Sequence, residues 1–462
     1  MPIPRQERNA RLVLLLLLLC AFPLPHARAA NSDVVPIRWA AFRGGTAGDV
    51  DSLRIRAILV NANRYALTTW WKQRGWSRQR DAYLSLGGTD EAHIRPPASE
   101  AFALAVSLKT GAYDPRKTGV PSAVAKERTL RLVRSLAYRH RANTPGGWGD
   151  NWQTALWASS AGFAGWLLWD ELSPTDQRSV QRMVEHEASR FNDYPVPYYS
   201  TRSGKIVSPG DSKAEENAWN GRILQLATAM MPRHPRRTLW QTKMIELMLS
   251  AFARPPDTTG VRQLHGRTLA DWLRGSNAGN DGSVMNHGRI HPDYFASVTD
   301  NVHGALLYTL AGLPTPRAAF FNADVVYAAL VDRPFAGGTV YREGSADVHY
   351  PEGTLWGMRR RMHFALLDIQ ARTFGFDRAA SKKGAYWEPL HTQSVLGMQQ
   401  RSKDGRTYQK LGEDTYPGRE EWVADLAAQA YLTRWLANQG RYAITGEPQF
   451  PLPRTAAGEE ES

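Results

Sequence analysis

The predicted mature part of this chain contains no cysteine. The single cysteine of the 462 residues, Cys20, lies in an apolar run over 12–22 that follows three arginines. This run is about half the length that a bilayer requires, and Ala27-Arg28-Ala29 supplies small residues on both sides of one position. We therefore predict a signal peptide over 1–29 and a secreted or periplasmic protein without disulfides, with no membrane insertion after cleavage. The alternatives are an uncleaved anchor and a lipoprotein, although Leu19 is bulky where a lipoprotein signal needs a small residue.

Linkers, repeats and nucleic-acid modules are also absent. We find no low-complexity linker within 35–447 and no fixed-period repeat, which favours one domain over 30–452 followed by a disordered acidic tail over 453–462. The net charge is +13, and removal of residues 1–29 takes away four arginines and one glutamate and lowers it to +10. Without a compact Lys/Arg run, this surplus favours an acidic polysaccharide over a nucleic acid as partner. Alternatively, the arginine content only reflects codon usage.

Helical patterns dominate the chain, and strand patterns are scarce. Ser173-Pro174 predicts a helix start with an N-cap, and Ser212 with Glu215 predicts a capping box. A single domain of this length exceeds the usual size of one core, whereas a ring of paired helices has an annular core that grows with helix number. We therefore expect an all-α fold, an (α/α) toroid or incomplete barrel of paired helices, with long aromatic loops and little β structure. Apolar residues recur at three-and-four spacing in 50–73, 98–111, 124–140, 152–170, 174–191, 213–231, 236–253, 294–312, 356–374 and 419–438.

Two loops rich in aromatic residues are candidate substrate contacts. Trp148 and Trp152 flank a glycine-rich loop at a helix start, where lining a cleft and packing in the core are both open. The stretch 341–357 is dense in polar and aromatic groups, and Arg342, His349 and Tyr350 are its candidate contacts. The alternative for this stretch is an ordered surface loop. The stretch 341–357 would enter the same cleft as the stretch Gly275 to Val298 if helix ends alternate around a toroid.

The segment 210–220 places polar groups beside an apolar helix face. Asn217 falls next to that face, and a buried amide must find partners or cost a few kcal/mol. It either caps a neighbouring helix end or donates a hydrogen bond to substrate. Glu215 is expected to be used in the capping box, while Glu216 remains a candidate acid, base or substrate contact.

The densest polar stretch is Gly275 to Val298. It contains Asp281-Gly282-Ser283, then His287 and, seven residues later, Tyr294. This run resembles the motif of helical-toroid polysaccharide lyases of the hyaluronate and chondroitin AC type, in which Asp-Gly-Ser leads into a catalytic His and then a catalytic Tyr. The match covers about fifteen residues, and the His-to-Tyr spacing here is shorter than in the family. Too few residues follow Tyr294 for the family's C-terminal β-domains, so the extent is closer to alginate-lyase-like and heparinase II/III-like toroids.

The resemblance implies a site and a reaction. It implies an Asn, here Asn217 with Asn151 as the rival, together with catalytic His287 and Tyr294. Lyase cleavage removes the proton beside a uronate carboxylate, which requires amide, imidazole or guanidinium donors such as Arg289 to neutralise that carboxylate. Tyr294 would act as base, acid or both, with its pKa lowered by nearby positive charge. No cofactor is implied.

Each of these residues also has a structural interpretation. His287 is alternatively a satisfied buried histidine, Tyr294 a core aromatic, and His291 either a turn cap or a substrate contact. Metal binding by His287, His291 and His303 is not expected, because their spacing matches no compact ligand motif.

Two other functions remain alternatives to the lyase. One is a glycoside hydrolase on the same toroid with Glu216 and either Asp281 or Asp293 as paired carboxylates. The other is a non-catalytic glycan-binding envelope protein. The sequence assigns no oligomeric state.

Overall fold

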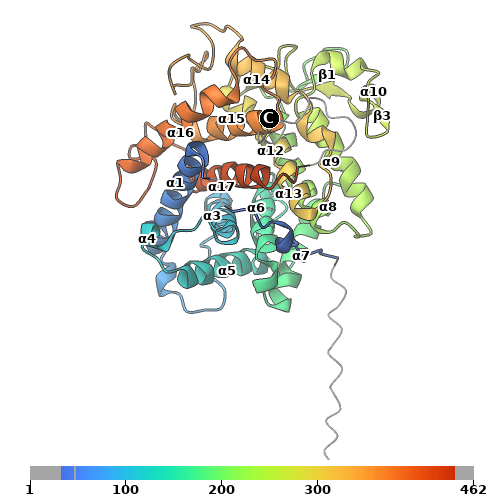
Figure 1. The fold of residues 1–462 in the computed structure, drawn as a ribbon. Helices are drawn as coiled ribbons and strands as arrows, with labels where there is room; N and C mark the ends of the chain where they lie inside the picture. The colour runs from blue at the N-terminus through green and yellow to red at the C-terminus, as the bar shows by residue number, and fades with distance from the viewer. Residues whose placement is uncertain (1–32, 46–47, 443–462) are drawn as a thin grey trace, which may run out of the picture. The chain divides into compact units, whose positions relative to one another are not determined.

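Helices form most of the described chain, residues 33–45 and 48–442, in the computed structural model (Figure 1). The expectation of a mainly helical fold with little β structure is confirmed. The predicted signal peptide (1–29) and acidic tail (453–462) lie outside the described residues. The helices of the first half are α1 (Val50–Tyr65), α2 (Trp71–Gln73), α3 (Glu91–Thr110), α4 (Pro115–Thr118), α5 (Ser122–Tyr138), α6 (Thr154–Leu167), α7 (Pro174–Ser189), α8 (Ala214–Met230) and α9 (Arg237–Ala251).

The second half is more irregular, and its strands are short. Its helices are α10 (Leu269–Trp272), α11 (Pro292–Phe295), α12 (Val298–Val302), α13 (Gly304–Ala311), α14 (Ala323–Val331), α15 (Arg361–Phe374), α16 (Gly384–Gln400) and α17 (Arg419–Asn438). Three antiparallel pairs join β1 (Ser200–Thr201) to β4 (Gly275–Ser276), β2 (Gln263–Leu264) to β3 (Arg267–Thr268) and β5 (Met285–Asn286) to β6 (Arg289–Ile290).

The predicted helix over 294–312 is broken into α11, α12 and α13. Ser297 donates its hydroxyl to the Tyr294 carbonyl at 2.6 Å, and Thr299 donates to the Ala296 carbonyl at 2.8 Å. Hydroxyl side chains that bond nearby carbonyls compete with the helical pattern. The break matters for the site, because it leaves Tyr294 on a separate short turn.

Two of the failures in helix prediction occur where proline stands inside a helix, whereas α14 was missed although it contains no proline. Helix α3 begins at Glu91, ahead of the predicted 98–111, and contains Pro96 and Pro97. Helix α16, which was not predicted, contains Pro389. Elsewhere the periodicity worked well, since α17 spans 419–438 as predicted.

The two predicted helix caps had opposite outcomes. Ser173 accepts a hydrogen bond from the Asp176 amide, with Pro174 as the first residue of α7, as predicted. The capping box of Ser212 and Glu215 is wrong, because α8 begins at Ala214 and Lys213 is its N-cap. Ser212 instead donates to the Asn277 carbonyl at 2.6 Å, which leaves the Glu215 side chain without a capping role.

Two kinds of helix differ in how far they are buried. Every residue of α6 except Leu156 is buried, and α8 is buried along nearly its whole length, whereas α5 and α7 bury one face. A helix that is apolar all round belongs to an inner layer. Contacts run from α3 to α6, α6 to α8, α8 to α12 and α13, α12 to α15, α15 to α17, and α17 back to α3. Figure 1 shows α17, α3 and α6 near one another, with α5 and α7 beside them.

Within the described part of the chain, every helix is too short or too polar to cross a lipid bilayer.

Candidate active site

A strained hairpin turn carries His287. Strands β5 and β6 are joined by His287 and Gly288, whose φ angles are 53° and 72°. Positive φ at both residues of a two-residue turn is the type I′ geometry, which favours Asn-Gly. A side chain in the left-handed region costs roughly 1–2 kcal/mol. Such backbone strain clusters at functional sites.

The Asp281-Gly282-Ser283 segment is a structural turn ahead of this hairpin. One carboxylate oxygen of Asp281 accepts the amide and hydroxyl of Ser283 at 2.9 and 2.6 Å, and Asp281 also forms an ion pair with Arg333. Gly282 has a φ of 83°, and a Cβ there would lie 2.7 Å from the Val325 carbonyl oxygen. The turn therefore requires glycine, and the Asp281 carboxylate is used within it.

The structure brings His287 and Tyr294 together. Tyr294 lies in the short helix α11, which begins at Pro292, and its hydroxyl is 2.7 Å from Nε2 of His287. His287 is exposed, whereas Tyr294 is buried. The imidazole also meets the Trp356 ring edge-on, with ring centroids 5.7 Å apart. An imidazole and a phenol in direct hydrogen bond are a proton-transfer pair in reach of solvent.

Two adjoining cavities open beside this pair. Their volumes are about 210 and about 380 Å³, and a third, smaller cavity of about 30 Å³ adjoins them. The two larger cavities share five lining residues: Trp152, Glu215, Trp219, His287 and Tyr294. Together they have the size of a small-molecule or oligosaccharide site.

The two tryptophans that were predicted to contact substrate lie in different environments. Trp152 is 58% exposed and meets Trp219 edge-on, with ring centroids 4.9 Å apart. Trp148 is buried, donates its indole N–H to the Leu136 carbonyl at 2.9 Å and packs against His140. Trp152 therefore lines the cleft, whereas Trp148 is a core residue.

Glu215 lies where the three cavities meet. It lines all of them, and no hydrogen bond or ion pair to it is found among the described residues. Burial, together with the charge of Asp300, raises the pKa of Glu215 to about 8, against the opposing effects of Arg95 and Arg360. At neutral pH Glu215 is therefore mainly a neutral carboxylic acid. Sequence reasoning missed it because the predicted capping box gave its carboxylate another role.

Arg360 is a buried cation in the cleft wall. It donates to both oxygens of Asp414 at 3.1 and 3.2 Å and to Asp293 at 3.3 Å. Tyr350 donates its hydroxyl to the other oxygen of Asp293 at 2.8 Å. Tyr350, predicted to contact substrate, is thus buried behind the wall and holds Asp293 in place.

Tyr294 does not have the lowered pKa that was expected. Burial raises its pKa above the usual value, and the charges of Glu215 and Asp293 act in the same direction. Only Arg360 opposes them appreciably. The phenol is therefore protonated at neutral pH, and a standing tyrosinate is not part of the site.

His291 is a buried neutral histidine. Burial lowers its pKa to about 4. Its ring meets Tyr294 and Tyr350 edge-on, with centroids 5.1 and 5.7 Å away, and neither ring nitrogen has a hydrogen-bond partner among the described residues. It supports the aromatic packing beneath Tyr294.

The two candidate amides do not line the cavities. Asn217 is fully buried and donates to the Pro197 carbonyl and the Ser250 hydroxyl, both at 3.0 Å. Asn151 is exposed and accepts from the Trp152 amide at 2.8 Å. Each amide therefore fixes a loop, and neither is brought together with His287 and Tyr294.

Four further predicted contacts have mixed positions. Glu216 lines the larger cavity and accepts from the Tyr194 hydroxyl at 2.8 Å. Arg289 lies on the hairpin itself and donates to the His287 carbonyl at 3.4 Å. Arg342 is exposed and bonds Gly337, while His349 bonds Ala336, so neither lines the cavities. The polar side chains of the predicted contact loop therefore mostly bond nearby backbone carbonyls and do not face the cavities.

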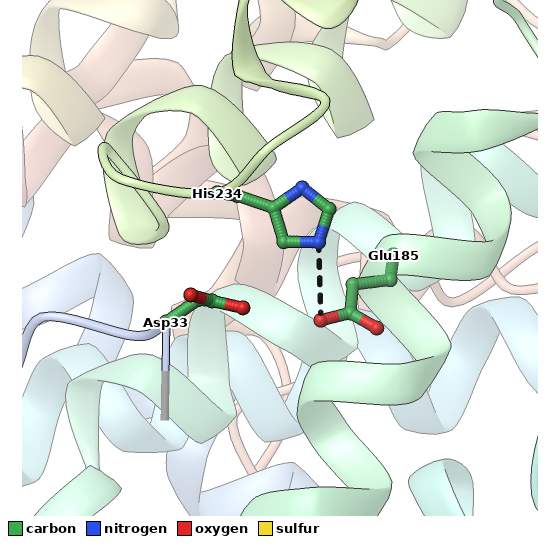
Figure 2. A group of neighbouring side chains, drawn as sticks. All are labelled: Asp33, Glu185 and His234. Atoms are coloured by element: carbon green, nitrogen blue, oxygen red, sulfur yellow. Dashed lines mark ion pairs between the residues drawn. The ribbon is translucent and has the colours of Figure 1, made fainter. Parts of the chain in front are cut away.

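One group of three potential metal ligands lies elsewhere in the described chain. Figure 2 shows Asp33, Glu185 and His234, with Nε2 of His234 3.6 Å from Glu185. Nδ1 of His234 accepts the Arg236 amide at 3.1 Å, which places the ring proton on Nε2. A metal bound at Nε2 would need that proton on Nδ1, so the hydrogen bonding of His234 does not favour a metal at this group. His287, His291 and His303 form no such group.

No known protein family, curated protein or solved structure matches this chain. The function therefore has to be inferred from the site itself.

Proposed function

We propose that this protein is a secreted or periplasmic polysaccharide lyase that cleaves a uronate-containing chain by β-elimination. The observation that carries the proposal is the 2.7 Å contact between His287 Nε2 and the Tyr294 hydroxyl, beside cavities walled by Trp152 and Trp219. Aromatic faces suit sugar rings. A phenol and an imidazole supply both proton transfers that elimination requires.

The proposed scaffold is the (α/α) toroid. Its support is the cyclic order of contacts among the largely buried helices, from α3 through α6, α8, α12 and α15 to α17 and back to α3. The amphipathic helices α5 and α7 pack on α6 from outside this cycle. In an inner ring covered by outer helices, the inner helices are buried on all sides and the outer helices bury only their apolar face.

The proposed proton path is compatible with the raised pKa of Tyr294. Its oxygen removes the proton beside the uronate carboxylate as its own proton passes to Nε2 of His287. The electron pair of the broken C–H bond forms the new carbon–carbon double bond, and the bond to the glycosidic oxygen breaks. The leaving oxygen then takes a proton from Tyr294, and His287 returns the borrowed proton. Since His287 accepts the phenol proton during transfer, no standing tyrosinate is needed.

Glu215 takes the role that the family resemblance implied for Asn217. As a neutral acid it donates a hydrogen bond to the substrate carboxylate, which makes the neighbouring C–H proton more acidic. Trp219 contributes a second neutral donor, because its buried indole N–H has no acceptor among the described residues.

A second candidate is a glycoside hydrolase, favoured by one observation. The raised pKa of Glu215 also fits a general acid that protonates a leaving oxygen. The general base of such a hydrolase would be Glu216 or Asp293, since both line the cavities. Asp281 is paired with Arg333 and lies outside the lining of the cavities.

The test is incubation of the purified protein with a panel of uronate-containing polysaccharides. We expect an ultraviolet band from an unsaturated uronate that grows with time. New reducing ends without that band would select the hydrolase. Binding without either product would select a glycan-binding protein and contradict the lyase.

A further inference from the structure

The cleft contains three permanent cations, and each already has acidic partners. Arg95 lies 2.8 Å from Glu91, and Lys213 lies 2.6 Å from Asp211 and 3.4 Å from Glu216. These residues all line the two larger cavities.

The third cation, Arg360, is paired on two sides. It lies 3.1 Å from Asp414 and 3.3 Å from Asp293. Among the described lining residues of the two larger cavities, no Lys or Arg is therefore left without a carboxylate.

The two guanidinium groups are also fixed in position. Arg360 lies over the rings of Trp356, Tyr416 and Trp422, with centroid distances of 5.3, 5.3 and 4.9 Å. Arg95 lies over Tyr416 and Trp422 at 5.0 and 5.7 Å. Stacked and paired guanidiniums lose these interactions if they turn toward a ligand. They are therefore poorly placed to follow a densely charged chain.

Acids outnumber cations in the same lining. Five acidic residues, one of them the largely neutral Glu215, face three Lys and Arg residues, although the whole sequence has 57 Lys and Arg against 44 Asp and Glu. A sulfate group placed here would meet carboxylates without a free counter-charge, and bringing such a charge out of water is strongly unfavourable. The acidic lining residues are Glu91, Asp211, Glu215, Glu216 and Asp293.

A single substrate carboxylate differs from a sulfate group, because neutral hydrogen-bond donors can bind it. Glu215 and Trp219 have unoccupied donor capacity where the cavities meet, beside the Tyr294 hydroxyl. Hydrogen bonds from neutral groups to a carboxylate favour its charged form without a full counter-ion. The donors are grouped at one place, so they serve one uronate and not a series of them.

We infer that the substrate is an unsulfated polysaccharide of low charge density, in which single uronates alternate with uncharged sugars. This inference rests on the proposed lyase function and names the substrate class of that same site. Sulfated chains and homopolymers of uronate are disfavoured by the paired cations and surplus acids.

The first experiment compares two pairs of substrates, one that differs in sulfation and one that differs in the density of uronates along the chain. Unsulfated chondroitin is set against chondroitin sulfate, and hyaluronate against alginate, with the ultraviolet band as the readout. We expect unsulfated chondroitin or hyaluronate to be cleaved at least about tenfold faster than the sulfated chain and the polyuronate, which corresponds to about 1.4 kcal/mol of discrimination. Faster cleavage of chondroitin sulfate or alginate would overturn the inference and leave the lyase function standing.

Binding gives a readout that does not depend on turnover. Quenching of tryptophan fluorescence, with Trp152 and Trp219 in the cleft, measures the affinity for oligosaccharides of the same four polymers. If no polymer yields an unsaturated product, the lyase function fails. In that case, tighter binding of the unsulfated alternating oligosaccharides still supports the substrate class. Tighter binding of the sulfated or polyuronate forms, or binding of none, contradicts it.

A variant tests the charge argument directly. Combining Asp211→Asn with Glu216→Gln leaves Lys213 without acidic partners in the larger cavity. We expect the ratio of sulfated to unsulfated cleavage or binding to rise by about three- to tenfold. The matched control is Glu343→Gln, which frees Lys382 on an exposed pair outside the cavities. An equal rise in both, or in neither, would show that the cleft charges do not select the substrate.

Discussion

Two segments of similar composition differ in what their polar groups contact. In the segment 285–294, His287 and Tyr294 bond each other beside the cavities. In the segment 341–350, Arg342 and His349 bond backbone carbonyls, and the Tyr350 hydroxyl is taken up by Asp293. The first segment keeps its polar groups available to a ligand, while the second uses them to hold the wall. A high density of polar residues in the sequence therefore does not by itself identify an active site, because the polar groups must also face the cavities.

The same difference recurs within one helix. Glu215 and Asn217 stand two residues apart at the start of α8, yet Glu215 lines the cavities and Asn217 is buried against Pro197 and Ser250. Two residues along a helix correspond to opposite sides of its axis. Variants at these positions separate catalytic groups from bracing groups.

The largest effect is expected for Tyr294→Phe. It removes the hydroxyl that bonds His287 and keeps the buried ring, so we expect kcat/KM for the cleaved polysaccharide to fall by about a hundred- to ten-thousandfold with little loss of stability. The matched control is Tyr138→Phe on an exposed ring, whose activity should match the wild type. Activity retained by Tyr294→Phe would remove the phenol from the mechanism.

His287→Asn separates catalysis from folding. Asparagine fits the first position of a type I′ turn but cannot act as the proton acceptor. We expect at least about a hundredfold loss of kcat/KM, together with an unchanged or higher free energy of unfolding, raised by up to about 1 kcal/mol. Urea unfolding and initial rates measure the two quantities. A stability loss in step with the activity loss would mean that the imidazole has a structural role.

Glu215→Gln should change the pH dependence of activity. Glu215 is neutral below its pKa of about 8, and above it the carboxylate repels the substrate carboxylate. The wild-type kcat/KM should therefore fall as pH rises through this value, by about fivefold over the next pH unit and by about tenfold per unit beyond it. The Gln variant stays neutral and should lack this alkaline fall. The charges around Glu215 are those of Asp293, Asp300, Arg95 and Arg360, and a fall that persists in the variant would assign it to another group.

Asn217→Ala should act on stability. It removes two buried hydrogen bonds and leaves the Pro197 carbonyl with only the longer one from Asn277, so we expect a loss of about 1–3 kcal/mol in the free energy of unfolding. The kcat/KM at a temperature where the variant is folded should stay within about threefold of the wild type. A selective collapse of kcat would instead return Asn217 to the catalytic group.

The smallest effect is expected in the segment 341–350. Arg342→Ala removes an exposed side chain that bonds Gly337, outside the cavities. Stability should change by no more than about 0.5 kcal/mol, with KM and kcat near the wild-type values. A clear rise in KM would show that this loop reaches the substrate after all.

Much of the fold was predictable because its helices are long and periodic. The pattern over 419–438 predicts the whole of α17, and Ser173-Pro174 marks the start of α7. Prolines hid the start of α3 and the whole of α16, because a local rule treats proline as a breaker while tertiary packing tolerates it. Helix periodicity carries no information on the order in which helices pack.

The candidate site was predictable where its residues are close in sequence. His287 and Tyr294 are seven residues apart, so a turn and a proline suffice to bring them together. Glu215, Trp219 and Arg360 reach the same cavities from distant segments. One signal was present for Glu215, since it stands four residues before Trp219 and therefore shares a helix face with it. The raised pKa of Tyr294 depends on burial, which the sequence does not display.

A backbone contact joins the cleft wall to the strained turn. The Gly288 amide donates to the Gly210 carbonyl at 2.8 Å, and a Cβ on Gly210 would lie 3.1 Å from Gly288 Cα. The loop ahead of α8 and the His287 turn therefore cannot shift independently. Hydrogen exchange at the single Gly288 amide thus reports on the contact between the two loops, and its slowing on ligand addition would show that the ligand stabilises this contact.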